Sequence, residues 1–195
     1  MIRTALRLLC HEEDTPAAIL KRINDLVARD TEADLFATMI YGILDTATAT
    51  FTYANGGHCY PLHWNNARSI DVLKTGSMLI GAFEEATFTT STCLLAPNDV
   101  LVFYTDGITE TAAGDAPVSD GNHSGPANSE QDDMCQDAIL TDTFYGGDRL
   151  AACLSKNAAL SASALCEAIV NDLAHFSGST QTHDDRALIV IKRDV

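Results

Sequence analysis

The chain has 195 residues, enough for one ordinary domain, of which 46% are hydrophobic and 20% are charged. This composition supplies a core and excludes disorder throughout the chain. The formal net charge of −15 disfavours a general nucleic-acid binder and docking on anionic lipid, because both need a cationic surface. No apolar run approaches the roughly 18–20 residues that span a bilayer, and the N-terminal apolar stretch breaks at Arg7. We therefore expect a cytoplasmic protein without a membrane segment.

The six cysteines are scattered along the chain and form no C-x-x-C pair. Most lie in apolar periodic segments, where a free cysteine behaves as a small buried hydrophobe. This distribution indicates a reducing compartment, with a disulfide or a zinc site as the alternative.

Apolar periodicity predicts two helices near the N-terminus, a strand-rich middle, two further helices and a last strand. Thr15-Pro16 starts the second helix, because a hydroxyl cap is followed by proline at the first helical position. The predicted helices cover residues 2–9, 16–29, 148–156 and 163–176. The predicted strands cover residues 36–44, 49–54, 60–64, 69–73, 87–95, 100–104 and 187–191. The hairpin-length turns between most strands favour antiparallel pairing, so the sequence predicts one α+β domain over residues 1–195.

Residues 112–143 differ in kind from the rest of the chain. They contain seven acidic residues and no lysine or arginine. Low apolarity and high charge are typical of a mobile surface insertion. A solvated loop without specific chemistry and a docking loop for a basic partner are both consistent with this stretch.

Acidic residues flank the two most apolar predicted strands. Asp106 follows the strand 100–104 directly, and Asp184 and Asp185 precede the strand 187–191. If these strands are antiparallel neighbours, the end of the first and the start of the second share one edge of the sheet. Carboxylates at one sheet edge can hold hard divalent cations. The alternative is an ordinary Asp-Gly turn and a solvated Asp-Asp loop.

Several motifs, taken in chain order, resemble those of the metal-dependent protein phosphatases (PPM, or 2C-type), in the bacterial branch typified by the sporulation stage II E phosphatase domain. The most specific is YTDGITE at 104–110, which is similar to "Y-T-D-G-hydrophobic-T-E" in that branch. The other resembling segments are FATMIYGILD at 36–45, YANGGH at 53–58, residues 76–81, PND at 97–99, GDRL at 147–150 and HDDRAL at 183–188.

This resemblance implies an antiparallel β-sandwich flanked by pairs of helices, with a two-metal site at one end. It implies Asp106 and Asp184 as catalytic metal ligands, Asp185 as a further metal-site residue, and Mn²⁺ or Mg²⁺ as the cofactor. The implied activity is metal-assisted hydrolysis of phosphoserine or phosphothreonine on a bacterial regulatory protein, such as an anti-sigma-factor antagonist.

The chain also departs from the family pattern. Relatives begin with strands that carry a Gly-Asp pair whose aspartate bridges both metals, whereas Gly-Asp occurs here only at 114–115 and 147–148. We therefore expect an N-terminally truncated fold, weak or no activity, and self-association through an exposed sheet edge. Three explanations fit the missing Gly-Asp strands. Met1 could be an internal methionine of a longer enzyme, the chain could be a degenerate non-catalytic relative, or it could be a fragment completed by a partner. A non-catalytic pseudophosphatase that binds a phosphoprotein in a sigma-factor pathway is the alternative function.

His58 follows two glycines and allows two interpretations. It could act as a general acid, but a histidine beside a glycine turn is more often a hydrogen-bonded structural residue. We expect the structural role.

Overall fold

The computed structural model describes residues 2–10, 15–30, 36–65, 67–76, 78–114, 143–178 and 185–194. Its helices are α1 (Ile2–Leu9), α2 (Pro16–Asp30), α3 (Asp106–Thr109), α4 (Gly146–Asn157) and α5 (Ala162–Ser177). Its strands are β1 (Met39–Asp45), β2 (Thr50–Gly56), β3 (Leu62–Trp64), β4 (Ile70–Val72), β5 (Ser91–Leu94), β6 (Val100–Tyr104) and β7 (Leu188–Lys192). Within these residues, no helix has the length and apolarity needed to cross a membrane.

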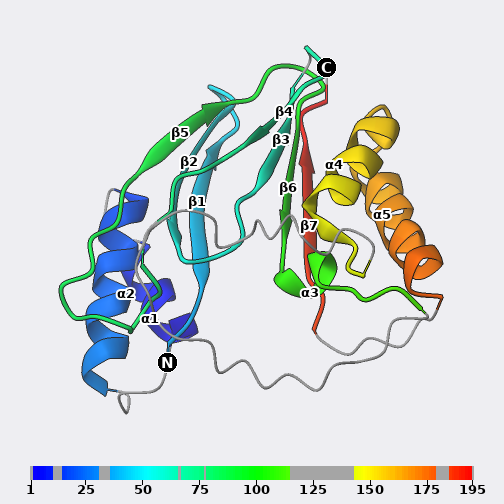
Figure 1. Cartoon of the computed structure of the whole chain (residues 1–195). Coiled ribbons are helices and arrows are strands. Elements are labelled where there is room, and N and C mark those ends of the chain that lie inside the picture. The colour runs from blue at the N-terminus through cyan, green and yellow to red at the C-terminus, as the bar shows by residue number, and fades with distance from the viewer. Residues whose placement is uncertain are drawn as a thin grey trace.

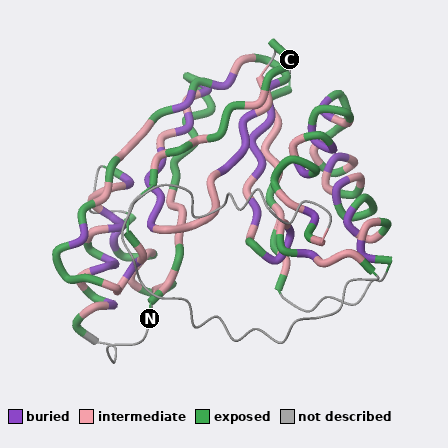
Figure 2. Tube along the Cα trace, in the orientation of Figure 1, coloured by how far each residue is buried: buried purple, intermediate pink, exposed green. Residues whose placement is uncertain are grey.

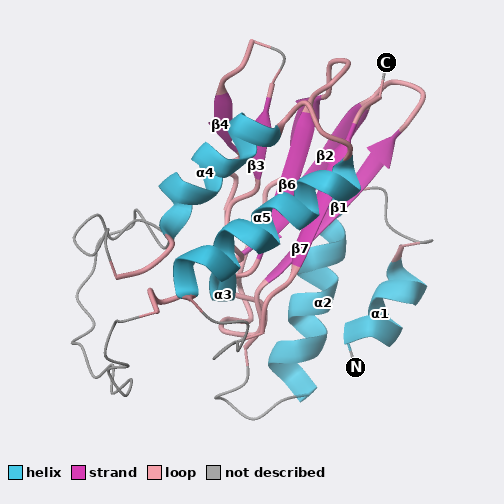
Figure 3. Cartoon of the chain, turned by 90° about the vertical axis from the view of Figure 1, so that its right-hand side faces the viewer, coloured by secondary structure: helices cyan, strands magenta, loops and turns pink. Residues whose placement is uncertain are grey.

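The strands form two antiparallel sheets with helices on both outer faces (Figure 1). One sheet has the order β1-β2-β5 and the other the order β4-β3-β6-β7. Helices α1 and α2 cover the first sheet, and Figure 3 shows α4 and α5 lying across the second. The predicted antiparallel β-sandwich flanked by helices is therefore confirmed.

The core consists of three apolar layers, one between the two sheets and one beneath each pair of helices. Strand β6 contributes to two of them, because successive side chains of a strand point to opposite faces. Val100, Val102 and Tyr104 pack beneath α4 and α5, while Leu101 and Phe103 pack between the sheets. Figure 2 shows buried residues concentrated on the inner strands and on the inward faces of the helices. This double burial explains why the segment is apolar throughout, and it confirms the predicted central strand.

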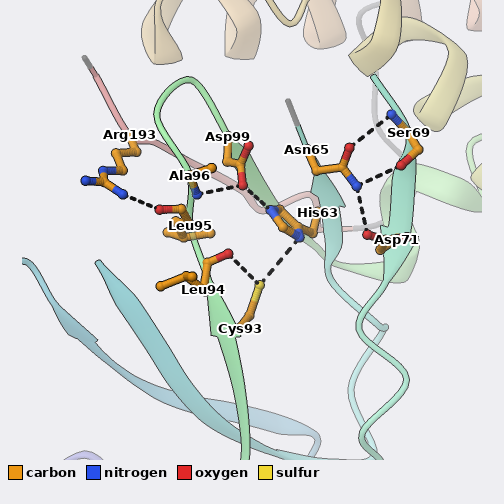
Figure 4. A network of polar contacts seen from close by, with 10 residues as sticks. All are labelled: His63, Asn65, Ser69, Asp71, Cys93, Leu94, Leu95, Ala96, Asp99 and Arg193. Atoms are coloured by element: carbon orange, nitrogen blue, oxygen red, sulfur yellow. Dashed lines mark hydrogen bonds and ion pairs between the residues drawn. The ribbon is translucent and has the colours of Figure 1, made fainter. Parts of the chain in front are cut away.

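A buried polar network ties the sheets together at the end of the sandwich where β6 begins (Figure 4). His63 Nε2 lies 2.9 Å from Asp99 Oδ2, and His63 Nδ1 lies 3.4 Å from Cys93 Sγ. Asp99 Oδ2 also accepts from the Ala96 backbone N–H at 2.8 Å. The network thus joins β3 to β5 and to the turn before β6.

The edge strands expose several apolar side chains. Among the described residues β1 pairs only with β2, and the Ile43 and Leu44 side chains of β1 are exposed. Within the described part of the chain β7 pairs only with β6, and Ile189 is 59% exposed. Such edges can pair with another chain. Self-association through an edge stays a prediction.

The predicted acidic insertion, residues 112–143, lies largely outside the described residues, which resume at Thr143. Its two ends are joined, because Ala112 and Phe144 form an isolated antiparallel bridge and the Ala113 N–H donates to the Thr143 carbonyl at 2.8 Å. The chain therefore leaves and re-enters the folded domain at one point. Among the described cysteines, Cys10, Cys93, Cys153 and Cys166 have free thiols.

Candidate active site at the end of β6

The pairing of β6 with β7 brings two of the predicted site residues to one edge of the sheet. The strands are antiparallel, and their last register pair at this end is Tyr104 with Leu188. Asp106 follows Tyr104 by two residues, and Asp185 precedes Leu188 by three. The expected juxtaposition of the strand end with the strand start is therefore present. Asp184 lies outside the described residues.

Hydrogen bonds continue past the last register pair and hold the two segments together. The Thr105 backbone N–H donates to the Ala187 carbonyl at 3.1 Å. The Thr105 hydroxyl donates to the Asp185 carbonyl at 3.2 Å and accepts from the Ala187 N–H at 3.0 Å. Arg186 Nε donates to the Gly107 carbonyl at 3.2 Å. The segment that carries Asp185 is thus fixed against the segment that carries Asp106.

Asp106 begins the four-residue helix α3, where the sequence analysis allowed an ordinary turn. Its carboxylate is exposed, and Oδ1 accepts from the Gly107 N–H at 2.9 Å. The Glu110 N–H and the Thr109 hydroxyl both bond to the Asp106 carbonyl, at 2.7 and 3.2 Å. Buried Ile108 anchors this turn in the core beneath α4 and α5. The Asp106 side chain is therefore held at the surface by a rigid turn.

His58 adds a third chain segment to the same end of the sandwich. The buried Asn55 side chain makes two hydrogen bonds to the His58 backbone. Its Oδ1 accepts from the His58 N–H and its Nδ2 donates to the His58 carbonyl, each at 2.8 Å. The His58 ring Nδ1 lies 3.0 Å from Thr38 Oγ1. Burial lowers the pKa of His58, and the charge of Asp106 opposes that shift. The hydrogen-bonded role expected of His58 is present, together with electrostatic coupling to Asp106 across the two sheets.

The sequence analysis did not single out Asn55, Thr38 or Thr105 as positioning residues. For Asn55 a signal existed, because an asparagine side chain often bonds to backbone groups a few residues ahead in a turn. The partners of Thr38 and Thr105 lie 20 and 80 residues away in the chain. Only the tertiary arrangement reveals them.

The carboxylates at this end of the sandwich are the kind of ligand that a hard divalent cation prefers, but the described residues provide few of them. Carboxylate oxygens are the ligands that Mg²⁺ and Mn²⁺ prefer, and both Asp106 and Asp185 are exposed. The described part of the chain contains no group of three His, Cys, Asp or Glu side chains placed to hold a metal ion. Asp106 and Asp185 therefore remain predicted ligands of a cation site, as does Asp184, which lies outside the described residues.

A hollow of about 600 Å³ lies between α4 and α5, away from the predicted site residues. Tyr145 at its floor donates to Asp172 Oδ2 at 2.6 Å, and Arg149 stacks 4.6 Å above the Phe176 ring. Burial raises the pKa of Tyr145 above its ordinary value, so the phenol stays protonated and able to donate. Asp172 and Arg149 are thus both engaged by aromatic side chains of this groove.

Comparisons with known proteins agree with this geometry. The stage II sporulation protein E (SpoIIE) family matches the chain over residues 1–194. "Phosphoserine phosphatase RsbU" of Bacillus subtilis is 26% identical over 111 residues, which are 56% of this chain and 33% of that protein. The chain spans between 23% and 36% of the length of the curated relatives that it matches.

Solved structures show the same fold. The "SiaA-PP2C domain of Pseudomonas aeruginosa" superposes with a TM-score of 0.70 at 21% identity, over 99% of this chain and 68% of that one. RsbX, described as being in complex with magnesium, superposes with a TM-score of 0.60 at 15% identity, over 98% of this chain and 70% of that one. The family match and this shared sandwich establish that the chain belongs to the SpoIIE family of PP2C-type phosphatase domains.

Proposed function

We propose that this chain is the phosphatase domain of a metal-dependent enzyme that hydrolyses phosphoserine or phosphothreonine on a regulatory protein, such as an anti-sigma-factor antagonist. The single observation that carries the proposal is the β6–β7 pairing, which places Asp106 and the Asp185 segment at one sheet edge. The name of the relative RsbU, a phosphoserine phosphatase, supports the substrate class.

Asp106, Asp184 and Asp185 are the proposed ligands for Mn²⁺ or Mg²⁺. Such a cation would activate water for attack on phosphorus and neutralise charge on the transferring group. RsbX in complex with magnesium supports the choice of a hard divalent cation. The rigid α3 turn orients the Asp106 carboxylate, and the bonds from Thr105 and Arg186 hold the opposing segment.

The alternative function is a binding module that holds a phosphoprotein without hydrolysing it. One observation favours it, since the described residues contain no cluster of three potential metal ligands. Adjacent divalent cations need several anionic ligands for neutralisation, so a pair of carboxylates would bind them weakly.

A phosphoserine peptide distinguishes the two functions. We expect phosphate release that requires Mn²⁺, is removed by a chelator and falls by more than about 100-fold in Asp106→Asn. Asp71→Asn is the matched control, because Asp71 is also exposed but lies on β4 beside Asn65. Saturable peptide binding without phosphate release would support the binding module, and neither binding nor release would contradict both functions.

A further inference from the structure

Thr105 links β6 to the segment before β7 through both its backbone and its side chain. Its N–H bonds to the Ala187 carbonyl, and its hydroxyl bonds to both the Asp185 carbonyl and the Ala187 N–H. We propose that Thr105 is a positioning residue that sets the Asp185 segment against Asp106 so that their carboxylates can share a divalent cation. This inference rests on the proposed function.

The hydroxyl makes the part of this link that depends on the side chain of residue 105. The Thr105 backbone bond to Ala187 simply extends the β6–β7 ladder by one step, and almost any residue would form it. The hydroxyl reaches further, to the carbonyl of Asp185, beyond the last register pair of the strands. Threonine also restricts rotation about χ1, because two heavy atoms branch from its Cβ. The hydroxyl therefore holds the Asp185 backbone in one place.

A fixed segment matters for cation binding because both carboxylates are exposed and carry the same charge. Without a cation their repulsion favours moving the two segments apart. Groups that orient metal ligands through hydrogen bonds, without binding the metal themselves, typically contribute 10- to 100-fold to metal affinity. We therefore expect the Thr105 hydroxyl to affect Mn²⁺ affinity more than it affects the fold.

Three variants isolate the hydroxyl. Thr105→Val removes it at nearly constant shape, Thr105→Ser retains it, and Thr105→Ala removes it with less bulk in case the valine variant does not fold. Thr75→Val is the matched control, because Thr75 is also half-buried and its hydroxyl also makes two bonds, donating to Ser91 Oγ at 2.7 Å and accepting from Tyr53 Oη at 3.1 Å.

The test is a Mn²⁺ titration of the whole chain, in which free Mn²⁺ is followed by electron paramagnetic resonance. Paramagnetic broadening of amide NMR signals locates the bound ion. In the wild type we expect the broadening to centre on residues around Asp106 and Asp185. Thr105→Val should raise the dissociation constant for Mn²⁺ by about tenfold. Thr105→Ser and Thr75→Val should stay within about twofold of the wild type.

Each result has a distinct meaning. Equal Mn²⁺ affinity in the wild type and in the folded valine or alanine variant would overturn the role of Thr105 and leave the proposed function standing. Weakening by Thr105→Ser to the same degree would also overturn it, because the hydroxyl would then not be the cause. Absence of Mn²⁺ binding in the wild type, or binding far from Asp106, would refute the metal site of the proposed function and the positioning role with it.

Discussion

The buried network opposite the proposed active site gives a quantitative prediction about stability. Asp99 is 2% exposed, and its Oδ2 accepts from two donors, His63 Nε2 and the Ala96 N–H. Asp99→Ala removes this acceptor from buried His63 and from the half-buried Ala96 N–H. Each buried donor left unsatisfied costs about 1–3 kcal/mol, and the half-buried Ala96 N–H should cost less because water can reach it. We expect Asp99→Ala to lower the free energy of unfolding by about 2–4 kcal/mol.

The free energy of unfolding is measured by urea denaturation, followed by circular dichroism. Asp99→Asn keeps one acceptor oxygen, so its loss should be smaller, at about 1–3 kcal/mol. Asp71→Ala is the control, because Asp71 is exposed and its change should stay within about 0.5 kcal/mol. A loss below about 1 kcal/mol in Asp99→Ala would refute the reasoning, since it would mean that the carboxylate does not satisfy buried donors.

Three further predictions concern electrostatics and packing. Because the negative charge of Asp106 raises the pKa of His58 against the effect of burial, Asp106→Asn should lower that pKa in an NMR titration of the ring; an unchanged value would show that the two residues are not coupled. Burial raises the pKa of the Cys93 thiol above its ordinary value of 9.0. The contribution of this thiol to the free energy of unfolding should therefore be constant below about pH 9 and decrease above it, because only the unfolded thiol ionises there. Urea denaturation at several pH values measures this decrease, which should be smaller in Cys93→Ala. A methyl group at position 42 would overlap the Phe51 ring, so Gly42→Ala should lower the melting temperature, with a loss of about 1–3 kcal/mol, whereas an unchanged melting temperature would mean that the ring moves aside freely.

The sequence predicts the order of the elements well, because β6 and the helices carry strong local patterns. The apolar run at 100–104 becomes a strand buried on both faces, and the Thr15-Pro16 signal marks the start of α2. Strand limits are less well predicted: the expected strand 87–95 is reduced to Ser91–Leu94. Thr90, which directly precedes β5, lies outside the sheet, and its hydroxyl accepts a hydrogen bond from the Ala17 N–H of α2. Such tertiary bonds leave no local pattern.

The candidate site shows the same division between local and tertiary information. The position of Asp106 relative to Asp185 follows from the antiparallel pairing of two recognisable strands. The coupling of His58 to Asp106 depends instead on how the two sheets pack, which no spacing within the chain encodes. From the sequence, Asp99 stands out only as part of the PND segment at 97–99, and its buried partner His63 lies 36 residues away. Residues whose partners lie on another sheet therefore required the structure.

The most direct test of the account is hydrolysis of a small aryl phosphate by this chain, with and without millimolar Mn²⁺, beside the Asp106→Asn variant. We expect turnover that requires Mn²⁺ and is lost in Asp106→Asn while the variant remains folded. Turnover that persists in Asp106→Asn, or that needs no divalent cation, would contradict the proposed metal-dependent site at the end of β6.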